Sequence, residues 1–411
     1  MRRSSWLKSV VAVAGAVGIA LGTVSVSGAS PASHERANKA TGKPIVIGAV
    51  IDETSTMKPF DQPALEAAEV WAKKVNAKGG VLGRPVEFKV YNDELQPALT
   101  KSDAEKAVAA GAKILWVTCD ATFAAPAIEV GLAHHLLTIA PCTSSSEMGP
   151  KKFGPAGRLA FSFGNEPSTT GAVIARLLMQ KGWKTATVVT DHLLTYFLDV
   201  CENFTADYKA LGGKIVSQLS YTTGDHTISQ VASKAASSGA SATVLCTTTT
   251  PTLPTFVTSV RTLGNTKPIV GPWSIDGGFW EPKTPKISTN LWWATYASVF
   301  GDDPNATVRA LYSQMKAEGE APLTGGFVLG PTALEGIVTA IERTKGSLTG
   351  AKLASALVHF HNVPTLSGLV SFSNAFHAVV GRAEAIIEVS NDKPHFVQLL
   401  TPGKYGLVLH T

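Results

Sequence analysis

The most constraining feature of this chain is a regular alternation of short apolar runs with amphipathic segments. The apolar run 44–52 is followed by an amphipathic helical pattern over 63–80, which closes at a pair of glycines. The pattern continues with apolar runs at 85–93, 113–119 and 136–141 and with helical segments at 99–112 and 123–135. Continuous apolar strands separated by helices indicate a parallel sheet covered on both faces.

The alternation restarts near residue 168 and predicts a second, similar sheet. Strand patterns lie at 185–191, 214–222, 242–250, 268–273 and 291–298, and helical patterns at 168–182, 196–213, 227–240 and 254–264. Three further helical patterns follow at 305–319, 328–344 and 350–361, and an alternating tail over 383–400 predicts a closing hairpin. The chain is therefore predicted to be an α/β protein with two doubly wound lobes.

Length and composition agree with two lobes. The 411 residues are 45% hydrophobic, which is ample for two buried cores. Charged residues make up 16%, and the formal net charge is +5. Since no run of Lys and Arg is long enough to resemble a nucleic-acid footprint, we expect no nucleic-acid partner.

The N-terminal segment 1–32 has the pattern of a signal peptide. Positive charges at Arg2, Arg3 and Lys8 flank an apolar run over 10–21, and small residues offer cleavage sites after Ala29 or Ala32. A membrane anchor is the alternative, but the run is short for a span of roughly 20 residues. The first cysteine is Cys119, so no lipid-modified cysteine is expected near the cleavage region. We expect export to a periplasm or cell-envelope space.

Four cysteines in an exported chain permit two disulfides. Cys119, Cys142 and Cys246 end strand patterns, and Cys201 lies on a helical pattern. The pairings 119–142 and 201–246 would each stay within one lobe. Four free buried thiols are the alternative, because spacing alone does not fix connectivity.

Polar and aromatic residues follow the strands of both lobes. Open α/β sheets bind ligands beyond the carboxyl ends of their strands. The positions concerned include Asp120 and Ala121, the run Cys142-Thr143-Ser144, Asp191 with Tyr196 after it, Thr249, and Trp273 with Asp276. Hydroxyls, amides and aromatics, rather than charges, predict a site for a small solute. A core position is the alternative for Trp273, because Trp is usually well buried.

Catalytic and metal-binding signatures are missing from the sequence. It contains no G-x-S-x-G, H-E-x-x-H or phosphate-loop motif. His134 and His135 are adjacent on a helix end and would point apart, so we expect no metal there. Asp191-His192 follows a strand, but no nucleophile is placed beside it. The chain is predicted to be neither an enzyme nor a cofactor protein.

The hydroxyl run 143–146 raises a further hypothesis. If a helix begins near Ser145 or Ser146, its free amides and the neighbouring hydroxyls would suit a carboxylate without any Lys or Arg. Simple capping of that helix is the alternative.

Several phrases resemble periplasmic branched-chain amino-acid-binding proteins, the type I solute-binding receptors of ABC importers. They are "VNAKGGVLGRPVEFKVYND" over 75–93, "ILWVTCDATFAAPA" with "LLTIAPCTSSSEM", and "KPIVGPW". The order of the strand and helix patterns is similar to that of the family over residues 45–388. The resemblance implies two Rossmann-like lobes joined by three crossovers, with a solute in the cleft between them. We place lobe 1 at 43–164 plus about 297–360, and lobe 2 at 165–296 plus about 361–411.

The resemblance also implies roles for individual residues. Ser144 would meet the ligand's carboxylate and amine, the Cys142 carbonyl would meet the amine, and Asp120 or Ala121 would stand where a carboxylate-binding Ser occurs. Phe60 and Phe327 would line the pocket, Tyr196 would close on the ligand, and Thr249 would lie near the position of a further pocket Tyr.

Two positions depart from the family pattern. Trp273 stands where the family has the Glu that pairs with the ligand's ammonium, and Leu95 stands where it has a disulfide cysteine. A buried ammonium without a carboxylate is costly. Either Asp276 or Asp120 replaces the Glu, or the ligand is not an α-amino acid.

The sequence thus predicts a monomeric exported substrate-binding protein of an ABC importer. It would capture an amino acid or a related carboxylate or amide by hinge closure and deliver it to a membrane permease. A ligand-sensing module of the same fold and a secreted α/β hydrolase are the alternatives.

Overall fold

The computed structural model describes residues 40–404, so the expected signal peptide at 1–32 and the last residues, 405–411, lie outside the described part. The first sheet has five parallel strands in the order β2-β1-β3-β4-β5. They are β1 (Ile45–Ile51), β2 (Val86–Asn92), β3 (Ile114–Val117), β4 (Leu137–Ala140) and β5 (Ala160–Ser162). The central strands are buried almost throughout, as expected for apolar runs. Strand β2 differs from that expectation: it lies at the edge of the sheet, and among its residues only Val86 is fully buried.

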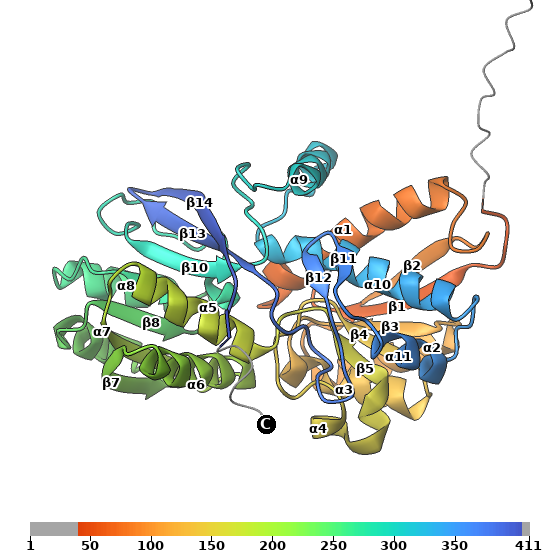
Figure 1. Cartoon of the computed structure of the whole chain (residues 1–411), viewed down its shortest axis with the longest axis horizontal. Helices are drawn as coiled ribbons and strands as arrows, with labels where there is room; N and C mark the ends of the chain where they lie inside the picture. The colour runs from red at the N-terminus through yellow and green to blue at the C-terminus, as the bar shows by residue number, and fades with distance from the viewer. Residues whose placement is uncertain (1–39, 405–411) are drawn as a thin grey trace, which may run out of the picture. The chain divides into compact units, whose positions relative to one another are not determined.

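Helices connect these strands and cover the sheet (Figure 1). They are α1 (Lys58–Ala77), α2 (Pro97–Ala109) and α3 (Ala121–Ala133), followed by the short α4 (Pro150–Phe153) and the 3₁₀ turn η1 (Gly154–Leu159). Helix α1 ends where the chain turns through Gly79 and Gly80, whose φ angles are 102° and 71°. A Cβ at Gly80 would collide with the Arg84 carbonyl, so this turn requires glycine.

The second sheet has seven strands in the order β14-β13-β10-β9-β8-β6-β7. They are β6 (Thr185–Asp191), β7 (Lys214–Tyr221), β8 (Ala242–Cys246), β9 (Ile269–Gly271), β10 (Leu291–Thr295), β13 (Glu384–Ser390) and β14 (Lys393–Leu400). Strands β6 to β10 are parallel, and β13 and β14 add an antiparallel hairpin to the edge. The predicted closing hairpin is therefore confirmed. The helices of this lobe are α5 (Pro167–Gln180), α6 (Thr195–Ala210), α7 (Ile228–Ser237) and α8 (Thr252–Thr262).

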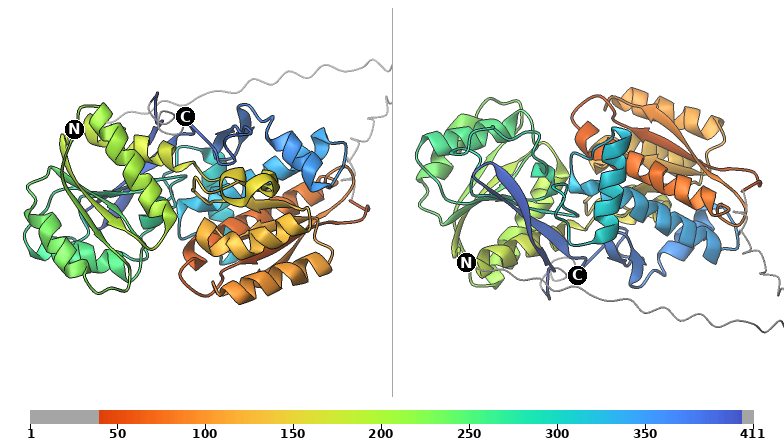
Figure 2. Two further views of the ribbon diagram at one scale, coloured as in Figure 1. Left: turned by 90° about the horizontal axis from the view of Figure 1, so that it is seen from below. Right: turned by 90° about the horizontal axis from the view of Figure 1, so that it is seen from above.

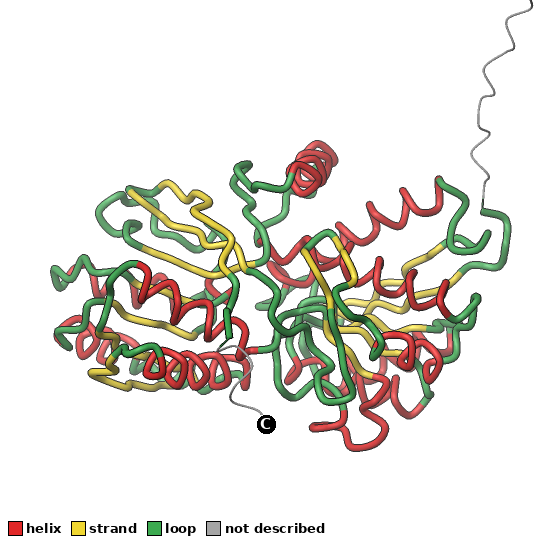
Figure 3. The backbone as a smooth tube through the Cα atoms, in the orientation of Figure 1, coloured by secondary structure: helices red, strands yellow, loops and turns green. Residues whose placement is uncertain are grey.

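The chain crosses between the sheets three times, in loop segments that lie between the two lobes (Figures 2 and 3). The crossings follow β5, β10 and the small sheet of β11 (Val363–Thr365) and β12 (Gly368–Val370). After β10 the chain forms α9 (Ala306–Glu318), the 3₁₀ turn η3 (Gly325–Val328), α10 (Leu329–Arg343) and α11 (Gly350–Leu357). The first and third crossings lie side by side, because Asn165 and Val379 form a β-bridge.

The lobe boundary expected near residue 360 falls later in the structure. Val370, Phe372 and Val379 belong to the core of the first lobe, together with Trp116 and Phe161. The chain therefore joins the second lobe only at the segment leading into β13. The sequence pattern did not show this, because β11 and β12 are too short to give a periodic signal.

Both expected disulfides are present, and the free-thiol alternative is wrong. Cys119–Cys142 joins the loops that follow β3 and β4, and Cys201–Cys246 joins α6 to the end of β8. Each disulfide stays within one lobe. Between residues 40 and 404, no helix combines the length and the apolar character that crossing a bilayer requires.

Candidate functional site

A cavity lies where the carboxyl ends of the two sheets face each other. Every residue around it follows a parallel strand: β1, β3 or β4 in the first lobe, and β6, β8 or β9 in the second. The lining residues are Thr56, Met57, Phe60, Cys119, Asp120, Phe123, Ser144, Leu193, Leu194, Tyr196, Phe197, Thr248, Trp273 and Ser274. This position agrees with the rule that open α/β sheets bind ligands beyond their strand ends.

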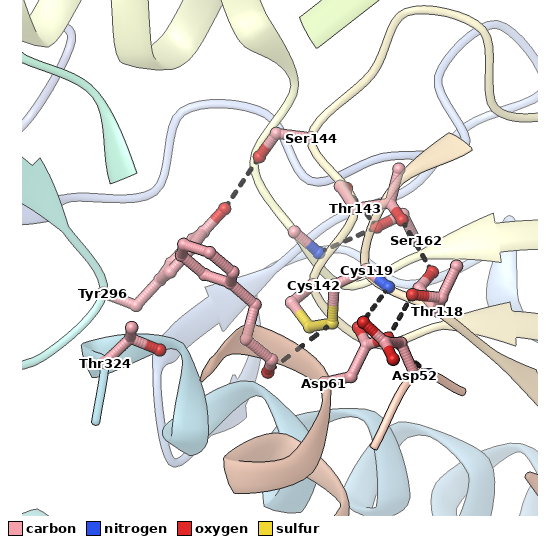
Figure 4. The surroundings of a disulfide bond; sticks show 12 residues. Asp52, Asp61, Thr118, Cys119, Cys142, Thr143, Ser144, Ser162, Tyr296 and Thr324 are labelled. Carbon is pink, nitrogen blue, oxygen red and sulfur yellow. Dashed lines mark hydrogen bonds between the residues drawn. A yellow bond between two sulfur atoms is a disulfide. The ribbon is translucent and has the colours of Figure 1, made fainter. Parts of the chain in front are cut away.

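The first lobe contributes an aromatic residue, a carboxylate and a hydroxyl. Phe60 lies in the first turn of α1. Asp120 caps α3, because its Oδ1 accepts hydrogen bonds from the amides of Thr122 at 2.8 Å and Phe123 at 3.1 Å. Burial raises the pKa of Asp120 to about 6. Ser144 follows β4, and its Oγ lies 2.8 Å from the Tyr296 hydroxyl (Figure 4).

The second lobe contributes a mainly apolar wall with three aromatic residues, Tyr196, Phe197 and Trp273. Trp273 begins the 3₁₀ turn η2 (Trp273–Ile275) and makes edge contacts with Phe60 at 5.0 Å and Tyr296 at 5.4 Å between ring centroids. Its indole lies against Gly326, where a Cβ would collide with the ring. Burial raises the pKa of the Tyr196 phenol well above its usual value, so this group stays neutral. The contact between Phe60 and Trp273 thus joins the two lobes directly.

Buried carboxylates support the first-lobe wall from behind. Asp61 accepts hydrogen bonds from the Cys119 amide at 2.7 Å, from the Asp52 amide at 3.0 Å and from the Thr118 hydroxyl (Figure 4). Burial raises the pKa of Asp61 to about 8. Asp52 accepts hydrogen bonds from the amides of Met57 and Lys58 at the start of α1. These contacts fix the loops that carry Phe60 and Asp120.

The hypothesis of a helix starting at Ser145 or Ser146 is wrong. The loop after β4 continues to Gly149, and the helix that follows, α4, has only four residues. Gly149 has a φ of 93°, which interrupts a helix in this stretch, and the hydroxyls form other bonds. Ser146 Oγ donates to Asp199 on α6 at 2.8 Å, and Ser145 Oγ accepts from the Glu147 amide at 3.0 Å. The hydroxyl run therefore connects loops and lobes, and only Ser144 lines the cavity.

Asp276 is not a pocket residue. It is fully buried, and its carboxylate accepts bonds from Trp293 Nε1, the Thr295 hydroxyl and the amides of Gly277 and Gly325 at 2.5–2.7 Å. Because four protein donors occupy its oxygens, it has no capacity left for a ligand ammonium. Asp276 instead ties the loop after β9 to β10 and to η3.

The structure brings together five of the predicted binding residues: Phe60, Asp120, Ser144, Tyr196 and Trp273. Ala121, Cys142 and Thr143 are buried beside the lining without belonging to it. Thr248 takes the lining position expected for Thr249, one residue further along the chain. Phe327 is fully buried in the cluster around Phe60 and contacts the Tyr312 ring, not the cavity.

Nine of the fourteen residues that line the cavity were not among the predicted binding residues. Leu193 and Leu194 lie in the loop after β6, Phe123 and Phe197 lie in the first turns of α3 and α6, and Ser274 follows Trp273. All of them follow strands that the sequence pattern had predicted. A short distance from a predicted strand end could therefore have suggested these residues, but it does not show which side chains face the cavity.

The crossovers meet in a buried polar cluster next to the cavity. The Tyr296 hydroxyl that contacts Ser144 also accepts a bond from the Asn165 amide at 3.0 Å. The Asn165 side chain accepts from Arg382 Nε at 2.9 Å and donates to Glu384 at 2.6 Å. Since Asn165, Tyr296 and Arg382 lie on three different crossings, this cluster joins the crossings to one another and to the pocket.

The candidate catalytic and metal positions lie elsewhere. The buried Asp191 accepts bonds from the amides of Leu193 and Thr223 and from the Thr223 hydroxyl, while His192 is exposed. His134 pairs with Glu105 on the surface at 3.0 Å. Within residues 40–404, no group of three or more metal-ligating side chains is assembled.

Two α/β lobes with three crossovers and a cavity at their facing strand ends define a bilobal solute-binding protein. A family model described as periplasmic binding protein matches residues 44–393. The chain therefore belongs to the periplasmic binding protein family, whose members are solute-binding proteins rather than enzymes. This confirms the family resemblance and the fold expected from the sequence. No curated protein matches the chain.

Solved structures share this fold at low sequence identity. The branched-chain amino acid transporter substrate-binding protein LivJ from Streptococcus pneumoniae, in complex with isoleucine, is 18% identical with a TM-score of 0.75, covering 87% of this chain and 100% of that one. The leucine-binding protein LivK from Thermotoga maritima is 17% identical with a TM-score of 0.74, covering 87% and 99%. An ABC-transporter solute-binding protein from R. palustris, in complex with 4-hydroxybenzoate, is 16% identical with a TM-score of 0.74, covering 89% and 99%.

Proposed function

We propose that this chain is the exported substrate-binding protein of an ABC importer, and that it captures a small organic solute between its lobes by hinge closure. The observation that carries the proposal is a cavity whose two walls belong to different lobes. A solute that contacts both walls binds the closed arrangement better than an open one, so binding shifts the population toward closure.

The buried polar cluster of Asn165, Tyr296, Arg382 and Glu384, which we call the hinge cluster, supports this mechanism. Tyr296 contacts Ser144 in the cavity wall and Asn165 in the first crossing. A solute that moves Ser144 therefore acts on the residues about which the lobes turn. The closed surface would then be recognised by a membrane permease, and the receptor would act as a monomer.

The lining favours a solute with a large apolar part. Phe60, Phe123, Tyr196, Phe197 and Trp273 surround the cavity. Their contact with a ligand would contribute about 25 cal/mol for each Å² of apolar area buried. Related structures hold isoleucine and 4-hydroxybenzoate, both of which have an apolar body, and this supports a solute of similar size here.

The test is a screen for ligand-induced stabilisation of the purified, ligand-stripped chain. The panel contains amino acids, aromatic carboxylates, amides and amines, and small-angle scattering of each hit measures compaction on binding. We expect at least one class to raise the melting temperature and to reduce the radius of gyration. A complete panel without a hit, or binding without compaction, would contradict the proposal.

Ser144→Ala tests the position of the site. We expect it to weaken binding by about 1–3 kcal/mol, because it removes a polar partner of the solute and of Tyr296. Ser233→Ala is the matched control, since Ser233 is exposed on α7 and bonds within its own helix. Equal affinities of the two variants would exclude Ser144 from the site.

A further inference from the structure

The cavity is lined by very few charged residues. Among its described lining residues there is one carboxylate, Asp120, and no Lys, Arg or His. Asp120 is only 5% exposed, and no basic group between residues 40 and 404 forms an ion pair with it. Glu147, which pairs with Lys152 at 2.8 Å, lies near the cavity and raises the pKa of Asp120 further. The pocket thus holds a buried negative charge that is stabilised by two amides of α3 but has no counter-cation, and a cation would stabilise it further.

Asp120 also blocks the place where a solute carboxylate would bind. The first amides of a helix have no partner within the helix, and such amides suit an anion. Here the Asp120 carboxylate already accepts from two of them, those of Thr122 and Phe123. A second carboxylate at this point would meet a filled site and a like charge. The carboxylate-binding role that the family resemblance implied for position 120 or 121 therefore does not fit.

The remaining walls are suited to a cation. Aromatic rings attract ammonium groups through their quadrupoles, most strongly where water is excluded. Five aromatic residues from both lobes line the cavity beside Asp120. Trp273, the best ring type for this interaction, is held in place by Phe60 and Tyr296. With Asp276 saturated by four protein donors, Asp120 is the acid left to balance an ammonium.

We propose that the solute is an organic ammonium compound without a carboxylate, held by the aromatic walls and balanced by Asp120. This assignment rests on the proposed function, because it names the class of solute that the interlobe cavity takes. The neutral hydroxyls of Ser144, Thr248 and Ser274 meet the remainder of the solute. Amino acids and benzoate-type anions are disfavoured, because their carboxylates find no positive group in the lining.

The experiment compares charged and neutral probes of the same shape by calorimetry and thermal shift. The probes are choline and its neutral isostere 3,3-dimethylbutan-1-ol, phenethylamine and phenylacetate, and also isoleucine and benzoate. We expect an ammonium probe to bind at least about tenfold more tightly than its uncharged or anionic counterpart.

Two variants locate the effect. Asp120→Asn removes the charge but keeps an oxygen that caps α3, because Asn and Asp are equally good caps; it should abolish the preference for ammonium. Phe60→Leu keeps an apolar side chain but removes an aromatic ring, and it should weaken the binding of choline more than the binding of the neutral isostere. Asp225→Asn is the matched control: this carboxylate is also a turn cap, but it is fully exposed and does not line the cavity.

The outcomes separate this inference from the proposed function. Tighter binding of isoleucine, benzoate or phenylacetate than of every ammonium probe would overturn the cation assignment and leave the receptor function intact. An ammonium preference that survives in Asp120→Asn would overturn the role of Asp120. If neither these probes nor the wider solute panel binds, both proposals fail.

Discussion

The Tyr296 hydroxyl gives the sharpest test of the link between pocket and hinge. It contacts Ser144 Oγ at 2.8 Å and accepts from the Asn165 amide at 3.0 Å, and both partners are buried. Tyr296→Phe keeps the ring that packs on Trp273 but removes both bonds. Each bond contributes about 1 kcal/mol net, and the cost rises when the abandoned partner stays buried. We therefore expect a loss of about 2–3 kcal/mol in the free energy of unfolding.

The assay is urea denaturation followed by intrinsic fluorescence. Tyr312→Phe is the matched control, because Tyr312 is half-buried and packs on Phe327 through its ring alone in the described structure. Tyr312→Phe should lower the free energy of unfolding by less than about 0.5 kcal/mol. If the two variants lose equal stability, the Tyr296 hydroxyl does not connect the lobes, and the hinge cluster as described would be refuted.

Three further predictions concern other parts of the molecule. Replacing Cys201 and Cys246 together by alanine should lower the free energy of unfolding by about 3–4 kcal/mol, since the disulfide closes a long loop; an unchanged urea midpoint would contradict this. Gly326→Ala should displace the Trp273 indole and reduce solute affinity while circular dichroism stays native; unchanged affinity would place that ring outside the site. Burial raises the pKa of Asp120 to about 6, so the native state binds more protons than the unfolded state between about pH 4 and 6. The free energy of unfolding should therefore fall as pH rises through that window, and Asp120→Asn should reduce this slope. Affinity for an ammonium probe should instead rise toward pH 7, as Asp120 ionises in the presence of Glu147 and the neutral Tyr196; equal affinities at pH 5 and pH 7 would contradict the role of Asp120.

The local sequence pattern was sufficient to predict the strands and the sheet edge near which a ligand would bind. Apolar runs such as "PIVIGAVI" and "ATVLC" have few alternatives to a buried strand, and helices between them force the strands to run parallel. Parallel strands bring their carboxyl ends to one edge of each sheet, so Asp120 could be placed near Ser144 in the first lobe and Tyr196 near Trp273 in the second. That the two edges face one cleft was implied by the family resemblance. The hydroxyl run misled the prediction, because a Ser-rich stretch is equally compatible with a helix cap and with a loop that bonds across lobes.

The sequence by itself thus determined the two doubly wound lobes, the family and the strand ends that surround the pocket, because these depend on periodicity and order along the chain. Only the tertiary structure decided which residue after each strand faces the cavity. Asp120 and Asp276 both follow strands, yet one borders the cavity and the other is enclosed by four donors. Whether a carboxylate is free for a ligand depends on donors far away in the sequence, such as Gly325 for Asp276, and no local pattern records them.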